Sequence, residues 1–307
     1  MKLVGLLFAA LLLPQAPIER RPPPQAPTLR VETRLVNVAV NVVDAQGAPV
    51  AGLTQADFQI AEDGKPQKIA FFEKESSTPL SIVLAIDASE SVFGNKRLEL
   101  DAARHFIDSL LRDQDELDLI DFSDTVREIV SFTNQKKRIE RGLHELQPGD
   151  ETALYDAIYL GAQRLAETRR DAGRRRVLVL ITDGVDTKGV AYEQALEQAQ
   201  RAGAMIYPLI IVPVAADAGR NTGGEHALIQ MAHDTGGKYY YVEDPRDLKT
   251  AFAHLSDDLR TQYVLGYYAP QKKSESTFRA IAVQMKDPAL RGKYVLRYRG
   301  GYYADTR

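Results

Sequence analysis

Five oxygen-bearing side chains stand where segments of the chain change character: Asp87, Ser89, Ser91, Thr152 and Asp183. The first three follow an apolar run at 80–86, the fourth lies in the loop 148–152, and the last follows an apolar run at 177–181. Hard cations such as Mg²⁺ prefer oxygen ligands. Because hydroxyl groups add no charge, a cation held by few carboxylates stays electrophilic and can accept one more anionic oxygen. These residues therefore predict a divalent-cation site with oxygen ligands alone.

The two apolar runs have the composition of parallel strands that are buried on both faces. Between 80 and 260, such segments alternate with segments of helical spacing, as in Leu98, Ala102, Phe106 and Leu110. The alternation favours an α/β fold with a doubly wound, mostly parallel sheet covered by helices on both sides. In open sheets of this class, ligands bind at the carboxyl ends of the strands. The three oxygen-bearing segments are therefore expected to meet at one edge of the sheet.

Pro208 lies inside the strand expected at 205–212. Proline cannot donate a hydrogen bond to a neighbouring strand and belongs at an edge or a bulge. Two outcomes are open: the strand bulges at Pro208, or the strand expected at 238–242 pairs with only part of it.

The two ends of the chain have strand chemistry of another kind. Val36, Val38, Val40 and Val42 alternate with other residues, which is the period of a half-buried strand. Further strand-like segments flank the central region: 58–61, 68–72, 263–268, 278–286 and 293–303. An Asp-Gly turn at 63–64 predicts a hairpin. Neither end has enough strands for a stable sheet alone. We therefore expect both ends to pair into a smaller all-β sandwich in which the α/β domain is inserted.

The first residues have the pattern of a secretory leader. Lys2 is followed by an apolar run from Leu3 to Leu13, whereas about 20 residues are needed to span a bilayer. Residues 14–27 are rich in proline and predict an extended linker. We expect an exported protein, periplasmic, attached to the cell envelope or secreted, that is not an integral membrane protein.

Composition excludes several classes of function. The 307 residues carry a net charge of −3, and no stripe of basic residues is interleaved with aromatic ones, so we expect no nucleic acid partner. The absence of cysteine excludes disulfides, thiolate zinc sites and a cysteine nucleophile. Motifs of serine hydrolases, P-loop enzymes and zinc proteases are absent, and we expect no enzyme.

Two other groups of residues have plain explanations. His226 and His233 are seven residues apart without a matching carboxylate, so we expect surface or packing roles. A cluster of arginines precedes the strand at 177–181 and is expected to form a solvated loop: Arg169, Arg170, Arg174, Arg175 and Arg176.

Each oxygen-bearing segment alone could be a helix cap. Three motifs in order favour a metal site instead: LAIDASES, DETALYDAI and VLVLITDG. Together they resemble the metal-ion-dependent adhesion site of von Willebrand factor type A (VWA) domains, and the similarity covers about residues 78–257. The resemblance implies that Ser89, Ser91 and Thr152 are ligands, whereas Asp87 and Asp183 bind directly or through water. The flanking segments resemble a VWFA-related subfamily of exported bacterial proteins, best known from acidobacterial genomes.

The sequence departs from the family pattern near the expected cation. Glu90 stands where glycine is usual, and Asp150 and Glu151 replace a common Gly-Gly pair. These carboxylates can be solvated surface charges. Alternatively, they tune the site toward Ca²⁺ or repel an acidic partner.

These observations predict four segments: a signal peptide and linker at 1–27, half of the sandwich at 28–77, the VWA domain at 78–257, and the other half at 258–307. We expect a protein-binding module for adhesion or scaffolding, whose divalent cation completes its coordination with the acidic group of an unidentified protein ligand. Mg²⁺ is the first choice, with Ca²⁺ or Mn²⁺ as alternatives. Two other hypotheses remain: a Mg²⁺-dependent hydrolase, and a structural envelope component with a purely stabilising metal.

Overall fold

The computed structural model describes residues 33–74, 78–89, 96–168, 174–184, 186, 189–212, 222–270 and 277–304, which fall within one compact unit, Thr33–Arg307. The expected leader and linker lie outside the described residues, as do Glu90 and Ser91. No helix in the described part of the chain is long and apolar enough to cross a bilayer.

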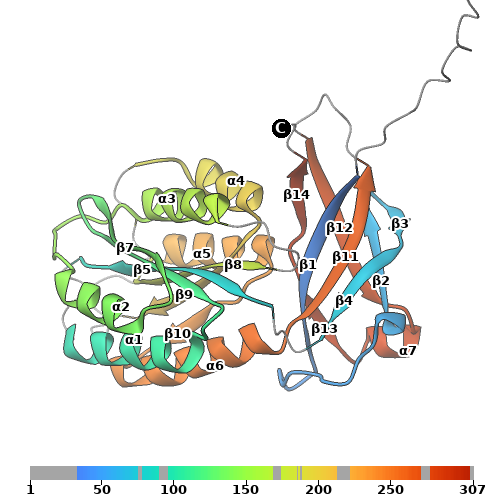
Figure 1. Cartoon of the computed structure of the whole chain (residues 1–307), viewed down its shortest axis with the longest axis horizontal. Helices are drawn as coiled ribbons and strands as arrows, with labels where there is room; N and C mark the ends of the chain where they lie inside the picture. Colours follow the sequence, from blue (N-terminus) through green and yellow to red (C-terminus); the bar gives the residue numbers. More distant parts are fainter. Residues whose placement is uncertain are drawn as a thin grey trace, which may run out of the picture. The chain divides into compact units, whose positions relative to one another are not determined.

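A six-stranded sheet forms from β5 (Leu80–Asp87), β6 (Glu116–Phe122), β7 (Val126–Thr133), β8 (Arg175–Thr182), β9 (Ala204–Ile211) and β10 (Tyr240–Val242). The strand order is β10-β9-β8-β5-β6-β7, and every pair is parallel except β6 with β7 (Figure 1). The expected α/β fold with a mostly parallel sheet is confirmed. Because β5 and β8 are parallel neighbours, their carboxyl ends lie at the same edge of the sheet, at the point where the strand order reverses.

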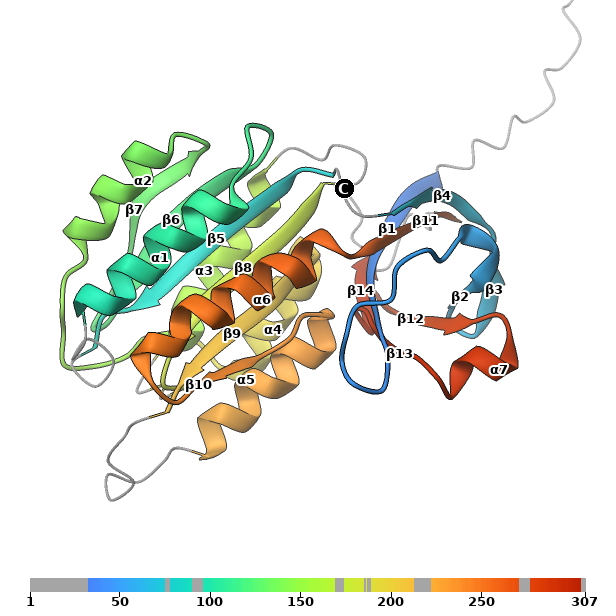
Figure 2. The ribbon, with the colours of Figure 1, turned by 90° about the horizontal axis from the view of Figure 1, so that it is seen from below.

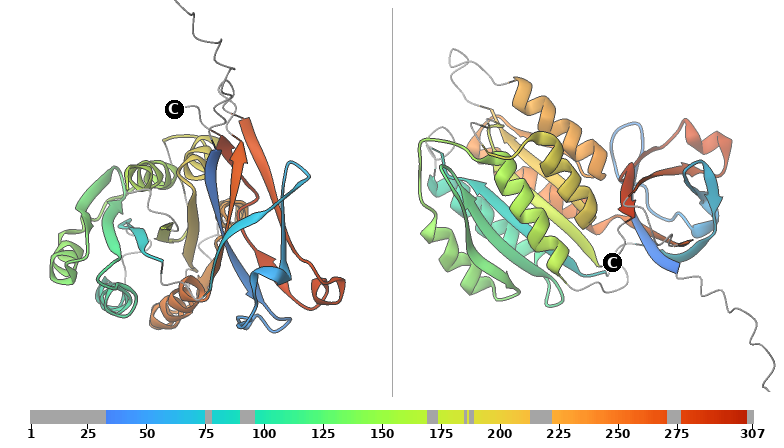
Figure 3. Two further views of the ribbon diagram at one scale, coloured as in Figure 1. Left: turned by 45° about the vertical axis from the view of Figure 1, so that its right-hand side comes forward. Right: turned by 90° about the horizontal axis from the view of Figure 1, so that it is seen from above.

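Six helices accompany this sheet: α1 (Lys96–Leu110), α2 (Lys136–Gly142), α3 (Leu154–Glu167), α4 (Tyr192–Ala202), α5 (Thr222–Thr235) and α6 (Leu248–Arg260). Ile82 and Leu84 share a core with α1, α2 and α6, whereas Val83 and Ala85 share the opposite core with α3, α4 and α5. Figures 2 and 3 show the two helical layers from either side. The continuous apolar run 80–86 is therefore explained by burial on both faces.

Pro208 is accommodated by partial pairing. Strand β9 pairs with β8 through Pro208, opposite Leu180, whereas β10 pairs only with Leu209–Ile211. The second of the two expected outcomes is confirmed, and β10 begins at Tyr240 rather than at 238.

The sandwich consists of β1 (Thr33–Val43), β2 (Phe58–Glu62), β3 (Lys65–Gln67), β4 (Ile69–Glu73), β11 (Tyr263–Pro270), β12 (Thr277–Met285), β13 (Val295–Arg297) and β14 (Gly301–Ala304), with the short helix α7 (Pro288–Arg291). Its two sheets have the orders β13-β1-β11-β4 and β14-β12-β2-β3. Strand β1 pairs with β11, and β2 with β12, so the two ends of the chain are interleaved. Val36, Val38, Val40 and Val42 are buried in the shared core. The expected sandwich from the N- and C-terminal segments is confirmed.

The expectation of one strand at 293–303 is wrong. The chain forms β13, bends at 298–300 and enters the other sheet as β14. Two short strands in different sheets close both sides of one core, which a single straight strand cannot do. The expected domain boundaries stay predictions, and the one at 257/258 falls inside α6.

Candidate metal centre

Asp87 ends β5 and is fully buried. Its carboxylate is held on both oxygens. The backbone N–H of Ser89 donates to Asp87 Oδ1 at 3.0 Å, and the hydroxyl of Thr182, at the end of β8, donates to Asp87 Oδ2 at 2.7 Å. The ends of β5 and β8 are thus joined through one carboxylate, whose orientation is fixed.

The segment before α3 is joined to the same edge by backbone contacts. Gly149 N–H donates to Ala88 O at 3.2 Å, and Gly149 forms an isolated bridge with Ser89. Ala153 N–H donates to Ser123 O at 2.9 Å. Thr152, between these two anchors, is buried. Backbone hydrogen bonds therefore join this segment to the end of β5, and the Thr182–Asp87 bond joins the end of β8.

Asp124, in the turn between β6 and β7, supports this loop and was not foreseen from the sequence. Its Oδ1 accepts the backbone N–H groups of Asp150 and Glu151 at 3.2 and 2.7 Å. The available signal was Ser-Asp-Thr at 123–125, directly after the strand expected at 117–122. Asp124 therefore fixes the backbone that carries Thr152, while the side chains of Asp150 and Glu151 are exposed.

Asp183 follows β8 and is buried. The next residue, Gly184, has a φ of 85°, and its N–H donates to Thr182 Oγ1 at 3.1 Å. A Cβ at this position would lie 3.3 Å from the backbone nitrogen of Glu225. The glycine therefore permits a tight turn directly after Asp183.

The loop after Asp183 is fastened to the first turn of α3 in both directions. Asp186 Oδ1 accepts the backbone N–H of Tyr155 at 3.1 Å, and Asp156 Oδ1 accepts that of Val190 at 3.0 Å. Gly189, with a φ of 114°, lies so close to Asp156 that a Cβ would collide with the carboxylate. This reciprocal pair of bonds was also not foreseen from the sequence.

The electrostatics of the edge suit a cation. Burial raises the pKa of Asp87 to about 6, and the negative charge of Asp183 adds to this rise, although hydrogen bonds from Ser89 and Thr182 oppose it. A divalent cation beside the two carboxylates would offset both effects. Oxygen donors alone fit a hard cation. The residues present therefore fit the expected metal.

The structure brings together four of the five expected ligands, and Ser91 lies outside the described residues. Ser89, Thr152 and Asp183 are buried, as is Asp87, and each makes at least one further interaction. No group of three His, Asp or Glu side chains within the described ranges is placed to hold a metal. The assignment of individual ligands, hydroxyl groups among them, stays a prediction.

Of the other candidates, His226 and His233 are exposed, as expected. The expectation of a solvated loop is wrong for Arg175, which is only 5% exposed. Its guanidinium donates to Thr78 Oγ1 at 3.1 Å and to Gln262 Oε1 at 2.6 Å. These partners are remote in sequence and replace the water that a charged side chain otherwise needs.

An α/β sheet with a buried, oxygen-only site at its carboxyl edge defines a class of metal-binding domain. The family profile of the von Willebrand factor type A domain matches residues 81–254, more than half of the chain. The chain belongs to this family. The likeness of its flanks to the exported VWFA-related subfamily stays a prediction.

Solved structures of low sequence identity share the fold. Proximal thread matrix protein 1 from the mussel byssus, with a zinc-occupied MIDAS motif, is 16% identical at a TM-score of 0.52; the match covers 65% of this chain and 50% of that one. The vWF domain of the type V pili tip protein Mfa5 from Porphyromonas gingivalis is 12% identical at a TM-score of 0.51, with 60% and 96% covered. The chain thus spans about half the length of the byssus protein. No curated protein matches the chain.

Proposed function

We propose that this protein is an exported, non-catalytic binding module that captures an acidic group of a protein partner through a divalent cation, with Mg²⁺ as the expected ion. The observation that carries the proposal is the buried carboxylate of Asp87, fixed by Ser89 and Thr182 at the carboxyl edge of a VWA domain. A bound cation supplies an electrophilic centre that can accept one more carboxylate oxygen.

The protein's own residues supply rigidity and low charge. Asp87 is oriented by hydrogen bonds from the protein's own groups, and Asp124 holds the loop of Thr152 in place. Hydroxyl donors from Ser89 and Thr152 leave the cation with more positive charge than a cage of carboxylates would. Because the protein's ligands neutralise the cation only in part, the cation favours an additional anionic oxygen from a partner.

Catalysis has less support. Hydrolysis at a metal centre needs a base that can receive a proton from water. His226 and His233 are exposed on α5, and the described ligand set consists of carboxylates and hydroxyls already engaged in hydrogen bonds. We therefore place binding ahead of hydrolysis.

Capture of a partner with and without chelator tests the proposal. The immobilised protein is exposed to an extract of the native cell envelope in Mg²⁺, in Ca²⁺ or in EDTA. A partner retained with metal, released by EDTA and not retained by Asp87→Ala supports the proposal. Asp101→Ala, which changes an exposed aspartate on α1, is the matched control. Metal binding without metal-dependent capture would favour the structural hypothesis instead.

Export is tested separately. If the apolar run 3–13 is a cleaved leader, protein recovered from the envelope or medium lacks it, and mass spectrometry finds a new N-terminus within the first 27 residues. An intact N-terminus on protein found only inside the cell would contradict export without affecting the binding proposal.

A further inference from the structure

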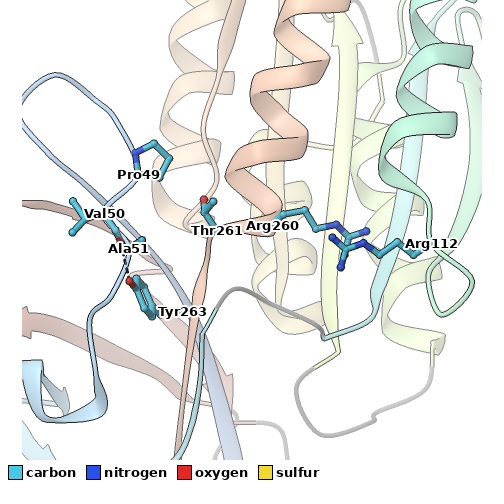
Figure 4. A pocket seen from close by; sticks show the side chains of 7 residues that line it. All are labelled: Pro49, Val50, Ala51, Arg112, Arg260, Thr261 and Tyr263. Atoms are coloured by element: carbon cyan, nitrogen blue, oxygen red, sulfur yellow. Dashed lines mark hydrogen bonds between the residues drawn. The ribbon is translucent and has the colours of Figure 1, made fainter.

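A pocket of about 320 Å³ opens at the amino edge of the six-stranded sheet, the edge opposite the candidate metal centre. Its lining comes from the loop 49–51, from Thr261 and Tyr263, and from two arginines, Arg112 and Arg260 (Figure 4). Small-molecule sites in proteins have volumes from about 300 Å³ upward. The pocket therefore has room for a small ligand.

One wall of the pocket is preformed. The hydroxyl of Tyr263 donates to Val50 O at 2.8 Å and accepts the N–H of Leu53 at 3.2 Å. These two bonds hold the loop 49–51 against β11. Pro49, Val50 and the ring of Tyr263 give this side an apolar surface, which suits the carbon part of a ligand.

The opposite wall presents two guanidinium groups that face one another (Figure 4). Arg260 Nη2 donates to Leu110 O at 2.6 Å and also pairs with Asp115. Arg260 Nη1 is buried and has no hydrogen-bond partner among the described residues. A buried donor without a partner is costly. The Arg260 side chain is 13% exposed, so an anion in the pocket can approach it and offset part of the cost of burying its charge.

Charge at this wall is unbalanced. Asp115 is the carboxylate paired with Arg260, and it also accepts the backbone N–H groups of Leu80 at 2.8 Å and of Arg112 at 3.0 Å. The guanidinium of Arg112 makes no ion pair within the described ranges. Two cations therefore lie near one carboxylate, which already accepts three hydrogen bonds. Burial lowers the pKa of Arg260, and the positive charge of Arg112 lowers it further.

We propose that this pocket binds a small oxyanion, a carboxylate or phosphate group of a low-molecular-weight ligand, between Arg112 and Arg260. Guanidinium groups present planar sets of donors that match the oxygens of both anions. The anion lies beside two like charges and offsets their repulsion, while the apolar wall contacts the rest of the ligand. This site is independent of the metal centre.

Calorimetric titration of the whole chain with inorganic phosphate and with succinate tests the proposal. The protein is first stripped of metal with a chelator and then dialysed into chelator-free buffer, since a polycarboxylate chelator could itself occupy the pocket. The titrations are done at ionic strength matched with chloride, because screening alone changes weak ionic contacts. We expect saturable binding of at least one anion, with tighter succinate binding identifying a carboxylate ligand and tighter phosphate binding identifying a phosphate ligand.

Two variants and a control localise the binding. Arg112→Gln removes an exposed cation without touching the core and is expected to weaken binding about fivefold or more, the effect of one charge at close range. Arg260→Lys keeps the charge but loses the planar set of guanidinium donors and is expected to weaken binding as well. Arg138→Gln changes an exposed arginine on α2, outside the pocket, and serves as the matched control.

Saturation in the wild type and in Arg138→Gln, with clear weakening in Arg112→Gln, supports the proposal. Absence of saturation at millimolar anion, or equal affinity in the wild type and Arg112→Gln, overturns it. Circular dichroism of Arg112→Gln verifies the fold. Because the protein is metal-free throughout, failure of this test is distinguishable from failure of the proposed metal-dependent function.

Discussion

The two edges of the six-stranded sheet both bury charge, but they balance it differently. At the amino edge, Asp115 pairs with Arg260, and Arg175 is surrounded by oxygen acceptors from Thr78 and Gln262. At the carboxyl edge, Asp87 is held by hydrogen-bond donors that carry no charge, and the second carboxylate nearby raises its pKa further. At the amino edge, buried charges are thus met by an opposite charge or by neutral acceptors, whereas the donors from Ser89 and Thr182 to Asp87 at the carboxyl edge are uncharged.

This difference separates structural charge from charge that awaits a ligand. A buried ion with a complete set of partners stabilises one arrangement of the chain, and loss of either partner is costly. A buried carboxylate without a cation is a cost in the folded state that a metal can remove. The pocket at Arg112 and Arg260 is the exception at the amino edge, because one positive charge there exceeds the carboxylate available.

The largest expected effect is at the amino edge, from Asp115→Ala. The change removes the partner of Arg260 and the acceptor for the backbone N–H of Leu80 and Arg112. We expect a loss of about 3–5 kcal/mol in the free energy of unfolding, measured in urea, because a buried charge is left uncompensated. Asp113→Ala, at an exposed site nearby, should change stability by about 0.5 kcal/mol or less. Equal effects of both variants would mean that the amino edge is not held by its charges.

At the carboxyl edge, Asp87→Ala should act on metal binding rather than on the fold. Without metal, the variant loses a carboxylate whose burial is unfavourable, so we expect a smaller loss of stability than for Asp115→Ala. With Mg²⁺ at about 100 times its dissociation constant, the wild type should gain about 2.7 kcal/mol, and the variant should gain nothing. Urea unfolding with and without Mg²⁺ measures both quantities, with Asp101→Ala as the control. An unchanged Mg²⁺ affinity in the variant would exclude Asp87 from the site.

Asp118, on β6, is intermediate between Asp115, which has a cationic partner, and Asp87, whose hydrogen-bond donors are uncharged. It is buried, and its carboxylate lies 3.5 Å from the Nε of Arg164, which also pairs with Glu128 and Glu167. Burial raises the pKa of Asp118 to about 8, and the charge of Glu128 adds to the rise. One guanidinium thus serves several carboxylates.

The raised pKa of Asp118 predicts a pH dependence of stability. Its folded-state pKa lies above the unfolded value, so the folded protein keeps a proton that the unfolded chain has lost from about pH 4 to about pH 8. The stabilisation is present in full below pH 4 and is lost as the pH rises to about 8, by up to about 1.4 kcal/mol per unit. Asp118→Asn should remove this slope, whereas Asp108→Asn, at an exposed site of α1, should keep it. Parallel curves for the wild type and Asp118→Asn would show that Asp118 is ionised in the fold.

Periodic features of the molecule could be predicted from the sequence because they repeat locally. The alternation at Val36–Val42 predicts a strand buried on one face, and the apolar run 80–86 predicts a strand buried on both faces. The structure has strands at both places, β1 and β5. The three ligand-bearing motifs could be placed for the same reason, since each follows or precedes a regular element. The parallel order of the strands then determines that they meet.

Features that depend on contacts between distant residues could not be predicted. Arg175 looks like part of a solvated cluster, and only its contacts with Thr78 and Gln262, 97 and 87 residues away, explain its burial. The support of the Thr152 loop by Asp124 could not be predicted either, because an aspartate in a turn commonly hydrogen-bonds to its own neighbouring backbone. The division of 293–303 into β13 and β14 follows from two sheets that share one core. The local sequence pattern of this segment does not indicate where one strand ends and the next begins.

The smallest expected effect concerns the acidic rim of the carboxyl edge. Asp150 and Glu151 are exposed, and their backbone is held by Asp124, so the double variant Asp150→Asn with Glu151→Gln should keep the loop unchanged. Exposed charges a few ångströms from a cation attract it only weakly in water. We therefore expect Mg²⁺ affinity to fall by about two- to fivefold at low salt and by less at physiological salt.

The same double variant separates exposed from buried charge at the carboxyl edge, since it removes two exposed carboxylates and leaves the buried ones unchanged. Fewer oxygens near the cation should move selectivity from Ca²⁺ toward Mg²⁺, because Ca²⁺ takes the larger shell. Affinity of the loaded protein for an acidic peptide should rise as two repelling charges disappear. Calorimetric titrations of both metals at two salt concentrations, with Asp113→Asn as the control for net charge, measure these changes. If metal affinities and their salt dependence are the same in the wild type and the double variant, the rim carboxylates are solvated surface charges, and the buried residues alone determine what the edge binds.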